Sequence, residues 1–411
     1  MNINPQLEWQ GFARADGRKG IRNTIVVVYL VECAHHVSRE IVAAFLDHEV
    51  HLIGFSGCYP NAYALRMLQQ LCTHPNVGGA LLVSLGCESM DRKTLANTIE
   101  QSGRPVQTLV IQREGGTRKT IEAGRAWVAS TLETLKDVPR VVMNARDLIV
   151  GTICGGSDAT SGLTANPAIG RAFDHLVEAG AATIFEETGE LIGCEDIMAE
   201  RAQTPELAHE LVASVQKAAG YYETLGHGSF APGNAEGGLT TQEEKSMGAY
   251  AKSGASRIAG LLKPGDVPPR NGNAPNENGG LYLLDVVPDG PVRFGFPNIN
   301  DTAEIAELIA CGSHVILFST GLGSVVGSAI SPVVKVCANP QTYRRMSEDM
   351  DVNAGRILDG ESSLDEVGNE IFARTLQTAA GERTASELLG HQEFVLTYKS
   401  FTPLGPACLP A

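Results

Sequence analysis

The chain of 411 residues lacks several features that would place it in a common class. No apolar run reaches about 18 residues, and no basic N-terminal region precedes an apolar one, which excludes a membrane span and a secretion signal. Cysteine is sparse, with nine residues, and this odd number is too small for a disulfide scaffold in a chain of this size. We therefore expect a cytoplasmic protein with reduced thiols.

Positive charge is also scarce. The chain has 32 lysines and arginines against 47 acidic residues, a formal net charge of −15, and no basic stripe. This balance excludes a nucleic-acid partner, because nothing replaces the phosphate counterions. The patterns GxGxxG with a following acid, GxxxxGK[ST], HExxH and GxSxG are absent as well. Their absence removes the usual nucleotide, zinc-protease and serine-hydrolase sites.

What the chain does contain is the pattern of an α/β protein, with 43% hydrophobic residues and 45 glycines. Continuous apolar runs alternate with helical patterns in the first part, and such runs indicate parallel strands covered on both faces. The expected strands are 24–30, 50–55, 79–85 and 106–111, and the expected helices are 34–47, 61–72, 92–101 and 117–136.

A second α/β unit follows a linker near residues 136–146. Its expected strands are 146–150, 181–185, 281–287 and 314–318, with helices from about 168 and over 340–349 and 364–379. The sequence therefore predicts two parallel-sheet, Rossmann-like α/β domains, an N-terminal one over 1–145 and a C-terminal one over 146–411. In such sheets ligands bind outside the carboxyl ends of the strands.

The glycine-rich segment 151–167 is the most informative stretch. It connects an expected strand to an expected helix start, which brings backbone N–H groups and a positive helix dipole to one place. It also carries a high density of reactive side chains. These are Cys154, Ser157, Asp158, Thr164 and Asn166. We predict that they line a site for an anionic ligand.

Three cysteines share one local pattern, since Cys58, Cys87 and Cys154 each lie beside glycine just past an expected strand. Thiolates placed in this way could converge on Fe²⁺ or an iron–sulfur cluster. Alternatively, cysteine is simply a small residue tolerated at tight strand ends. No CxxC spacing supports a zinc ribbon.

Two residues are candidate proton carriers. Glu187 belongs to an acidic group that ends the strand over 181–185, and a carboxylate there could be a general base or a metal ligand. His227 lies among glycines in a loop, which leaves its imidazole accessible. A solvated or structural role is the alternative for both.

Cationic side chains could bind the carboxylate of a substrate. Arg14, Arg18 and Arg22 lie together before the first long strand, either as an anion clamp or as a solvated charged turn. Lys245 and Lys252 follow a capped helix start and could reach a substrate from that helix.

These motifs together resemble the altronate dehydratase/galactarate dehydratase family over essentially the full length of the chain. The matching pieces include Arg14-x-Asp-Gly-Arg-x-Gly-x-Arg-Asn23, Leu85-Gly-Cys-Glu88, Cys154-Gly-Gly-Ser-Asp158, Thr164-Ala-Asn-Pro167, Gly237-Gly-Leu-Thr-Thr241 and Asp351-x-Asn-Ala-Gly355. The resemblance implies removal of water from a 2,3-dihydroxy acid to give a 2-keto-3-deoxy acid, with iron or another divalent metal.

The chain departs from the family pattern in two ways. Longer members begin with a small extra domain, so the resemblance implies a separately encoded small subunit, and we also expect a homo-oligomer. Leu322 stands in Thr320-Gly-Leu-Gly323, where the family pattern has arginine. A split into two subunits is also similar to (2R)-sulfolactate sulfo-lyase, a related type of enzyme that expels sulfite.

We therefore predict a lyase that performs β-elimination on a small hydroxy-acid anion. Glu187 or His227 would carry the proton, with Ser157 and Asp158 as further catalytic residues. Asn166, Thr164, Lys245 and the arginines would bind substrate. An alternative from another class is a non-catalytic, anion-binding subunit of a lyase complex.

Overall fold

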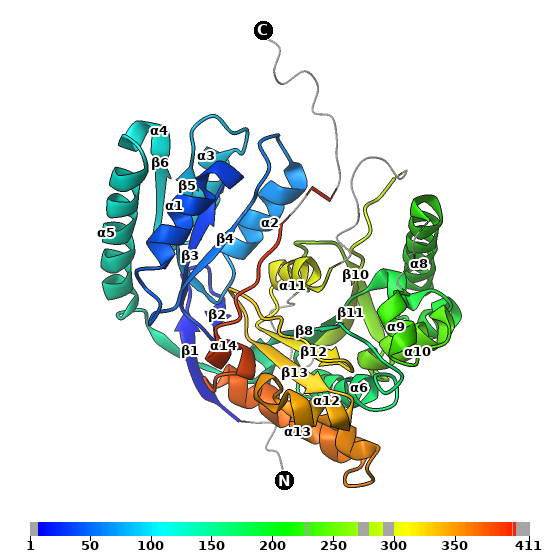
Figure 1. The fold of residues 1–411 in the computed structure, drawn as a ribbon. Coiled ribbons are helices and arrows are strands. Elements are labelled where there is room, and N and C mark those ends of the chain that lie inside the picture. The colour runs from blue at the N-terminus through cyan, green and yellow to red at the C-terminus, as the bar shows by residue number, and fades with distance from the viewer. Residues whose placement is uncertain are drawn as a thin grey trace.

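The computed structural model describes residues 7–226, 228, 230–269, 279–290, 300–396, 398 and 399. These residues form three sheets, of four, seven and three strands, with helices packed around the two larger ones (Figure 1). The predicted α/β class with two parallel sheets is confirmed. Within the described part of the chain, every helix is too short or too polar to cross a membrane.

The four-stranded sheet has the order β4-β3-β5-β6, and all its pairings are parallel. Its strands are β3 (Thr24–Tyr29), β4 (Val50–Gly54), β5 (Val77–Ser84) and β6 (Val106–Val110). Its helices are α1 (Glu32–Val42), α2 (Ala62–Cys72), α3 (Arg92–Gln101), α4 (Ile111–Glu114) and α5 (Thr117–Leu135). All four predicted strands and four predicted helices are present, because continuous β-branched runs such as Ile25–Val28 are buried on both faces.

The three-stranded antiparallel sheet was not predicted. It has the order β2-β1-β7, formed by β1 (Trp9–Ala13), β2 (Lys19–Gly20) and β7 (Arg140–Met143). These strands are short and have no clear alternation of apolar and polar residues, so the sequence gives little signal for them. The sheet joins the start of the described chain to the segment that leads into the seven-stranded sheet.

The seven-stranded sheet is parallel throughout and has the order β10-β11-β9-β8-β12-β13-β14. Its strands are β8 (Ile149–Cys154), β9 (Ala182–Phe185), β10 (Ile258–Leu262), β11 (Gly280–Leu284), β12 (Val315–Thr320), β13 (Val333–Cys337) and β14 (Val352–Asn353). The predicted first strand, 146–150, was wrong at both ends. Residues 151–154 belong to the strand because they pair in register with residues 316–319 of β12.

Helices flank the seven-stranded sheet on both sides (Figure 1). They are α6 (Ala165–Glu178), α7 (Glu195–Glu200), α8 (Pro205–Leu225), α9 (Pro232–Glu236), α10 (Gln242–Tyr250), α11 (Asp301–Ala310), α12 (Pro340–Arg345), α13 (Leu364–Ala379) and α14 (Ala385–Leu389). Helix α13 packs against α6, and α11 packs between β8 and α2. The expected helix over 340–349 ends earlier, at Arg345, and continues as a separate 3-10 turn over Ser347–Asp349.

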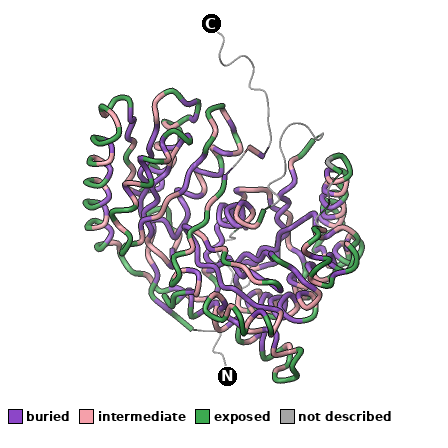
Figure 2. The backbone as a smooth tube through the Cα atoms, viewed as in Figure 1, coloured by how far each residue is buried: buried purple, intermediate pink, exposed green. Residues whose placement is uncertain are grey.

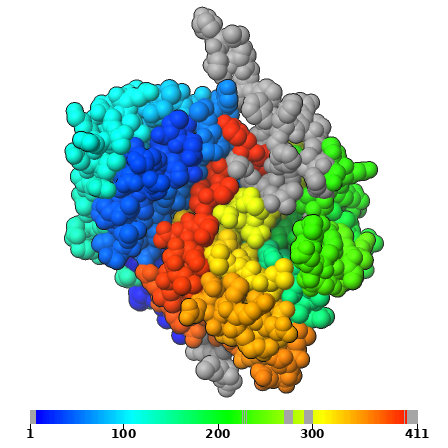
Figure 3. Space-filling model, viewed as in Figure 1, coloured from blue at the N-terminus to red at the C-terminus, as the bar shows by residue number. Residues whose placement is uncertain are grey.

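One apolar cluster joins the two larger sheets, and separate clusters cover their other faces. A single buried cluster contains Val26 and Leu68 from the first part of the chain together with Ile153, Leu308 and Phe318 from the second. The strands of both sheets are buried along most of their length (Figure 2). The C-terminal segment, red in Figure 3, runs between the two parts. Because one cluster joins the two sheets, the predicted boundary between residues 145 and 146 stays a prediction.

Candidate active site around Cys154

The site begins at the carboxyl end of β8. Cys154 is the last residue of this strand, and β8 lies between β9 and β12, so the order of strands reverses there. A crevice opens at such a reversal because the following chains leave the sheet in opposite directions. The N–H of Gly155 donates to the carbonyl of Ser319 at 3.0 Å, which fixes the turn beside Cys154.

Glu187 lies directly after the neighbouring strand and has an unusual backbone. Among the described residues, Glu187 is the only one other than glycine with a positive φ, at 79°. A left-handed conformation costs a residue with a side chain roughly 1–3 kcal/mol, and such strain concentrates at functional sites. The Oε2 of Glu187 accepts a hydrogen bond of 3.1 Å from the N–H of Cys154. The strained turn therefore directs this carboxylate back onto β8.

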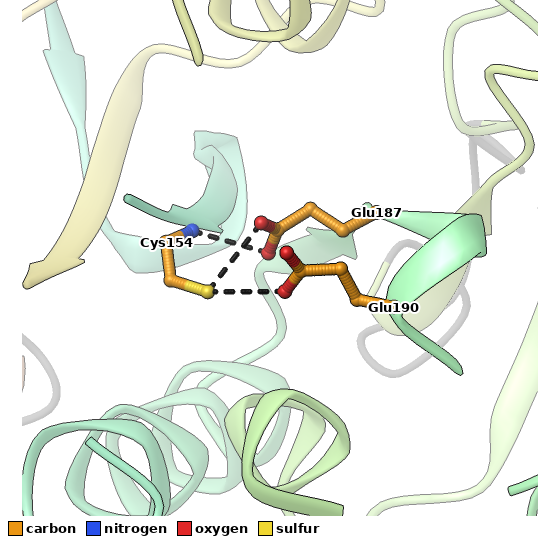
Figure 4. A group of neighbouring side chains, drawn as sticks. All are labelled: Cys154, Glu187 and Glu190. Carbon is orange, nitrogen blue, oxygen red and sulfur yellow. Dashed lines mark hydrogen bonds between the residues drawn. The ribbon is translucent and has the colours of Figure 1, made fainter. Parts of the chain in front are cut away.

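Cys154, Glu187 and Glu190 form one compact group (Figure 4). The Cys154 Sγ lies 3.4 Å from Glu187 Oε1 and 3.4 Å from Glu190 Oε2, and the hydroxyl of Ser157 donates to the same sulfur at 3.4 Å. Burial raises the pKa of the Cys154 thiol, and the charge of Glu190 raises it further. One thiol and two carboxylates, with possible ligand atoms all within 4.8 Å of one another, make a donor set that could hold a metal ion.

Two lysines form ion pairs with the two glutamates. Lys245 Nζ lies 2.5 Å from Glu190 Oε1, and Lys252 forms a fully buried ion pair with Glu187. Both lysines come from α10 and the 3-10 turn Ala251–Ser253 that follows it. Buried charges are tolerated when they are paired, and each of the two glutamates beside the thiol has a lysine as its partner.

A cavity of about 290 Å³ opens over this group. Its far wall includes Asp301 and Glu304, both from the first turn of α11. Asp301 packs onto Gly155, where a Cβ would lie 2.0 Å from Asp301 Oδ2, so this glycine admits the carboxyl into the cavity. Burial and the charge of Glu190 raise the pKa of Asp301 to about 6. Burial and neighbouring Glu186 raise the pKa of Glu304 well above its ordinary value.

A second cavity, of about 330 Å³, adjoins the first and shares Cys154, Ser157 and Lys245 with it. Asp158 and Asn166 line this second cavity, as the sequence suggested for the site as a whole. Both side chains also bind protein groups. The Asn166 amide donates to Gly248 O at 2.9 Å, and Asp158 accepts from the Asn339 amide at 2.9 Å.

Thr164 lies deeper, away from both cavities. Its side chain is fully buried, and its hydroxyl donates a hydrogen bond of 2.9 Å to the carbonyl of Ala338. This bond ties the start of α6 to the end of β13. The structure therefore gives Thr164 a contact within the fold, and its predicted role in substrate binding finds no support in the lining of either cavity.

The three arginines predicted as an anion clamp bind protein groups elsewhere. Arg14 is buried and donates to the carbonyl of Pro75 at 2.6 Å, and Arg18 donates to Asp16 at 2.7 Å. Arg22 binds both oxygens of Glu387, at 2.7 and 3.0 Å. None of the three lines either cavity. The guanidinium groups meet carbonyls and carboxylates of the chain itself, and the anion clamp stays a prediction.

The structure does not bring the three predicted metal-binding cysteines together. Cys58 and Cys87 are exposed and follow β4 and β5 of the four-stranded sheet, whereas Cys154 is buried at the end of β8. Among the described residues, the only group of three or more possible ligands pairs Cys154 with the two glutamates. His227, the second predicted proton carrier, lies outside the described residues.

Sequence reasoning missed the two acids of α11 and undervalued Glu190. Asp301 and Glu304 follow Asn300, which caps the helix by accepting from Ala303 N at 2.9 Å. In the sequence, an acid in the first turn after such a cap has a sufficient explanation in the helix dipole. Only the fold shows that this turn faces Cys154.

Sequence comparisons agree with this architecture. The profile described as D-galactarate/Altronate dehydratase, C-terminal, matches residues 145–402, and that described as D-galactarate dehydratase/Altronate hydrolase, second domain, matches residues 11–136. The chain has a parallel sheet with a thiol and acids where the strand order reverses, and its sequence is related to these dehydratases. The chain belongs to the galactarate/altronate dehydratase family.

Individual relatives include both dehydratases and a sulfo-lyase. The chain is 32% identical to the (2R)-sulfolactate sulfo-lyase subunit beta of Chromohalobacter salexigens, over 94% of this chain and 96% of that protein. It is 27% identical to the altronate dehydratase of Bacillus subtilis, over 96% and 78% of the two chains. It is 30% identical to the galactarate dehydratase (L-threo-forming) of Escherichia coli, over 92% and 74%.

Proposed function

We propose that the chain is a hydro-lyase that removes water from a sugar acid such as altronate or galactarate to give a 2-keto-3-deoxy acid. The observation that carries the proposal is the Cys154–Glu187–Glu190 group at the floor of a cavity that acids and a lysine line. Acid–base side chains and a possible metal site in one cavity are what elimination next to a carboxylate requires.

The donor set fits a single divalent ion. Cys154, Glu187 and Glu190 would hold it, and a mixture of one soft and two hard donors suits Fe²⁺ among other divalent metals. An iron–sulfur cluster fits less well, because clusters are held mainly by several thiolates and this group has one. When bound, the ion would act as a Lewis acid that stabilises the charge developing on the substrate carboxylate.

The other steps of the proposed reaction are assigned to different side chains of the site. The Oε1 of Glu187 lies beside the Cys154 sulfur and would face the ion, so we assign to Oε2, which is paired with Lys252 at the cavity floor, the proton removed from the carbon next to the carboxylate. Lys245 lines both cavities and supplies positive charge for the carboxylate of the acid. Ser157 holds the Cys154 sulfur in place.

The cavity chemistry favours a polyhydroxylated acid. Asp301 and Glu304 offer oxygens that accept hydrogen bonds from substrate hydroxyl groups. Leu322 also lines this cavity, in the place where the family pattern has arginine. The position supplies no positive charge for a second anionic group, which favours a monocarboxylate such as altronate over a dicarboxylate such as galactarate.

Elimination of sulfite is the second candidate, favoured by the 32% identical relative of which 96% is covered. That relative is named subunit beta, which supports a separately encoded small subunit for this chain as well. A third possibility is a non-catalytic, anion-binding subunit. Assembly into a homo-oligomer stays a prediction.

A substrate panel distinguishes these candidates. The chain would be purified without oxygen, loaded with Fe²⁺, and incubated with galactarate, altronate and (2R)-sulfolactate, with and without a co-expressed small subunit. We expect a 2-keto-3-deoxy acid from a sugar acid. Release of sulfite alone would replace the dehydratase proposal with the sulfo-lyase. Calorimetric binding without turnover, even with the small subunit present, would support the non-catalytic subunit.

A further inference from the structure

The carboxyl groups that line the first cavity fall into two sets. Glu187 and Glu190 lie beside Cys154, and each is paired with a lysine. Asp301 and Glu304 lie on α11 and, within the described part of the chain, neither forms an ion pair or a hydrogen bond with another side chain. One cavity therefore holds acids in two different environments, an arrangement that separates the acid and base roles in enzymes.

The surroundings of Glu304 are rich in other acids. Glu186, at the end of β9, is 1% exposed, and neither of its carboxyl oxygens has a partner among the described residues. Glu307, one turn further along α11, is fully buried. Asp301 completes the set on the cavity side.

Among the described residues, the lysines that approach these acids already have acidic partners. Lys399, from the C-terminal segment, forms a buried ion pair with Glu307, which also accepts a hydrogen bond of 2.5 Å from the Tyr63 hydroxyl. Lys252 faces Glu186 but is paired with Glu187. Glu304 thus faces the cavity with acids around it and, among the described residues, no cation of its own.

We propose that Glu304 is the acid that protonates the departing hydroxyl group of the substrate. This inference rests on the proposed dehydratase function and adds a catalytic residue to it. The Glu187–Lys252 pair takes the proton from C2, the C3–O bond breaks, and the Glu304 carboxyl gives its proton to the leaving oxygen, which departs as water. The enol then becomes the 2-keto acid as its C2 hydroxyl gives up its proton and C3 takes one up, and the proton held by the base returns to Glu304.

The protonation state of Glu304 agrees with this role. Burial, and then the charges of Glu186, Glu307 and Asp301, raise the pKa of Glu304 well above its ordinary value, whereas Lys399 opposes the shift. This direction of shift favours the protonated carboxyl that the role requires. Asp301, with a pKa of about 6, is mostly ionised at neutral pH.

The test uses a leaving group that needs no proton. Glu304→Gln would be assayed on the sugar acid that the wild-type holoenzyme dehydrates and on its 3-chloro-3-deoxy analogue, from which chloride departs unaided. We expect kcat on the hydroxy acid to fall about 10²–10⁴-fold, the usual contribution of a positioned acid, and release of chloride to fall less than tenfold. The alkaline limb of the wild-type pH profile should also disappear in this variant.

Two comparisons keep the result interpretable. Asp301→Asn makes the same carboxyl-to-amide change on the same helix. It should lower turnover of the hydroxy acid and of the chloro analogue equally, because Asp301 only binds substrate. Melting temperatures would show that both variants are folded. Equal losses on the two substrates in Glu304→Gln, or unchanged turnover of the hydroxy acid, would overturn the assignment. Absence of wild-type turnover of any sugar acid would instead contradict the proposed function.

Discussion

The backbone N–H of Cys154 donates a hydrogen bond to the carboxylate of Glu187, whose own backbone is left-handed. This contact joins the carboxyl ends of two neighbouring strands, β8 and β9, at the point where the sheet order reverses. It also brings a carboxylate against the thiol that we propose as a metal ligand. The strained turn at Glu187 is therefore the local feature on which the site depends.

Glu187→Gln should abolish turnover while the chain remains folded. The amide keeps the size of the side chain but loses the negative charge that serves the metal and the proton-accepting pair. We expect kcat to fall at least about 10²-fold, measured on the substrate identified in the panel. Glu210→Gln, on the exposed face of α8, is the matched control. Full activity in Glu187→Gln would remove this residue from the mechanism.

Iron content should depend on Cys154 and not on the two exposed cysteines. Cys154→Ser removes the one soft donor of the group, so anaerobically loaded iron should drop on the order of tenfold. Cys58→Ser and Cys87→Ser should keep wild-type iron, and no variant should contain acid-labile sulfide. Loss of iron and sulfide in either of the latter two would restore the three-cysteine cluster that the sequence suggested.

Lys252→Met should destabilise the fold. It would leave the Glu187 carboxylate buried without its cation, and breaking a buried pair in this way costs about 3–5 kcal/mol. Urea unfolding of the apo chain would measure the loss. The double variant Lys252→Met/Glu187→Gln removes both charges and should recover most of it. A double variant as unstable as the single one would show that Lys252 acts through packing alone.

Arg22→Ala should lower stability without raising KM, because Arg22 binds Glu387 and not substrate. Replacement of the exposed Arg39 should change neither quantity. We expect a loss of about 1–3 kcal/mol in the free energy of unfolding. A large rise in KM would instead return Arg22 to the substrate site.

The loss in the free energy of unfolding that Arg22→Ala causes should depend on pH. Burial alone would raise the pKa of Glu387, but the hydrogen bonds and charge of Arg22 lower it below its ordinary value. A carboxylate with a depressed folded-state pKa stabilises fully above the unfolded pKa of about 4.3 and loses that contribution as pH falls. The difference in the free energy of unfolding between the wild type and Arg22→Ala should therefore be constant near neutral pH and shrink below about pH 4.

Much of the fold follows from local sequence patterns. The strand over residues 24–29 and the helix over 364–379 appear where apolar periodicity predicts them, because burial on both faces and a capped amphipathic face leave clear signals. The antiparallel sheet of β1, β2 and β7 leaves no such signal. Its pairing joins residues more than a hundred positions apart, which no local pattern records.

The site was only partly predictable for the same reason. The density of reactive groups near Cys154 indicated a site, and Glu187 stood out at a strand end. The sequence could not show that the arginines near residue 18 meet Glu387 and Asp16, or that the first turn of α11 faces Cys154. Both facts depend on long-range packing of the two sheets around one shared cluster.

Anomalous diffraction from crystals soaked with Fe²⁺ and altronate tests the central claim most directly. The account predicts an iron peak among Cys154 Sγ and the carboxylates of Glu187 and Glu190, with the acid bound in the cavity between that peak and Glu304. Iron at Cys58 or Cys87, or an acid bound at Arg14, Arg18 and Arg22 away from this cavity, would contradict it.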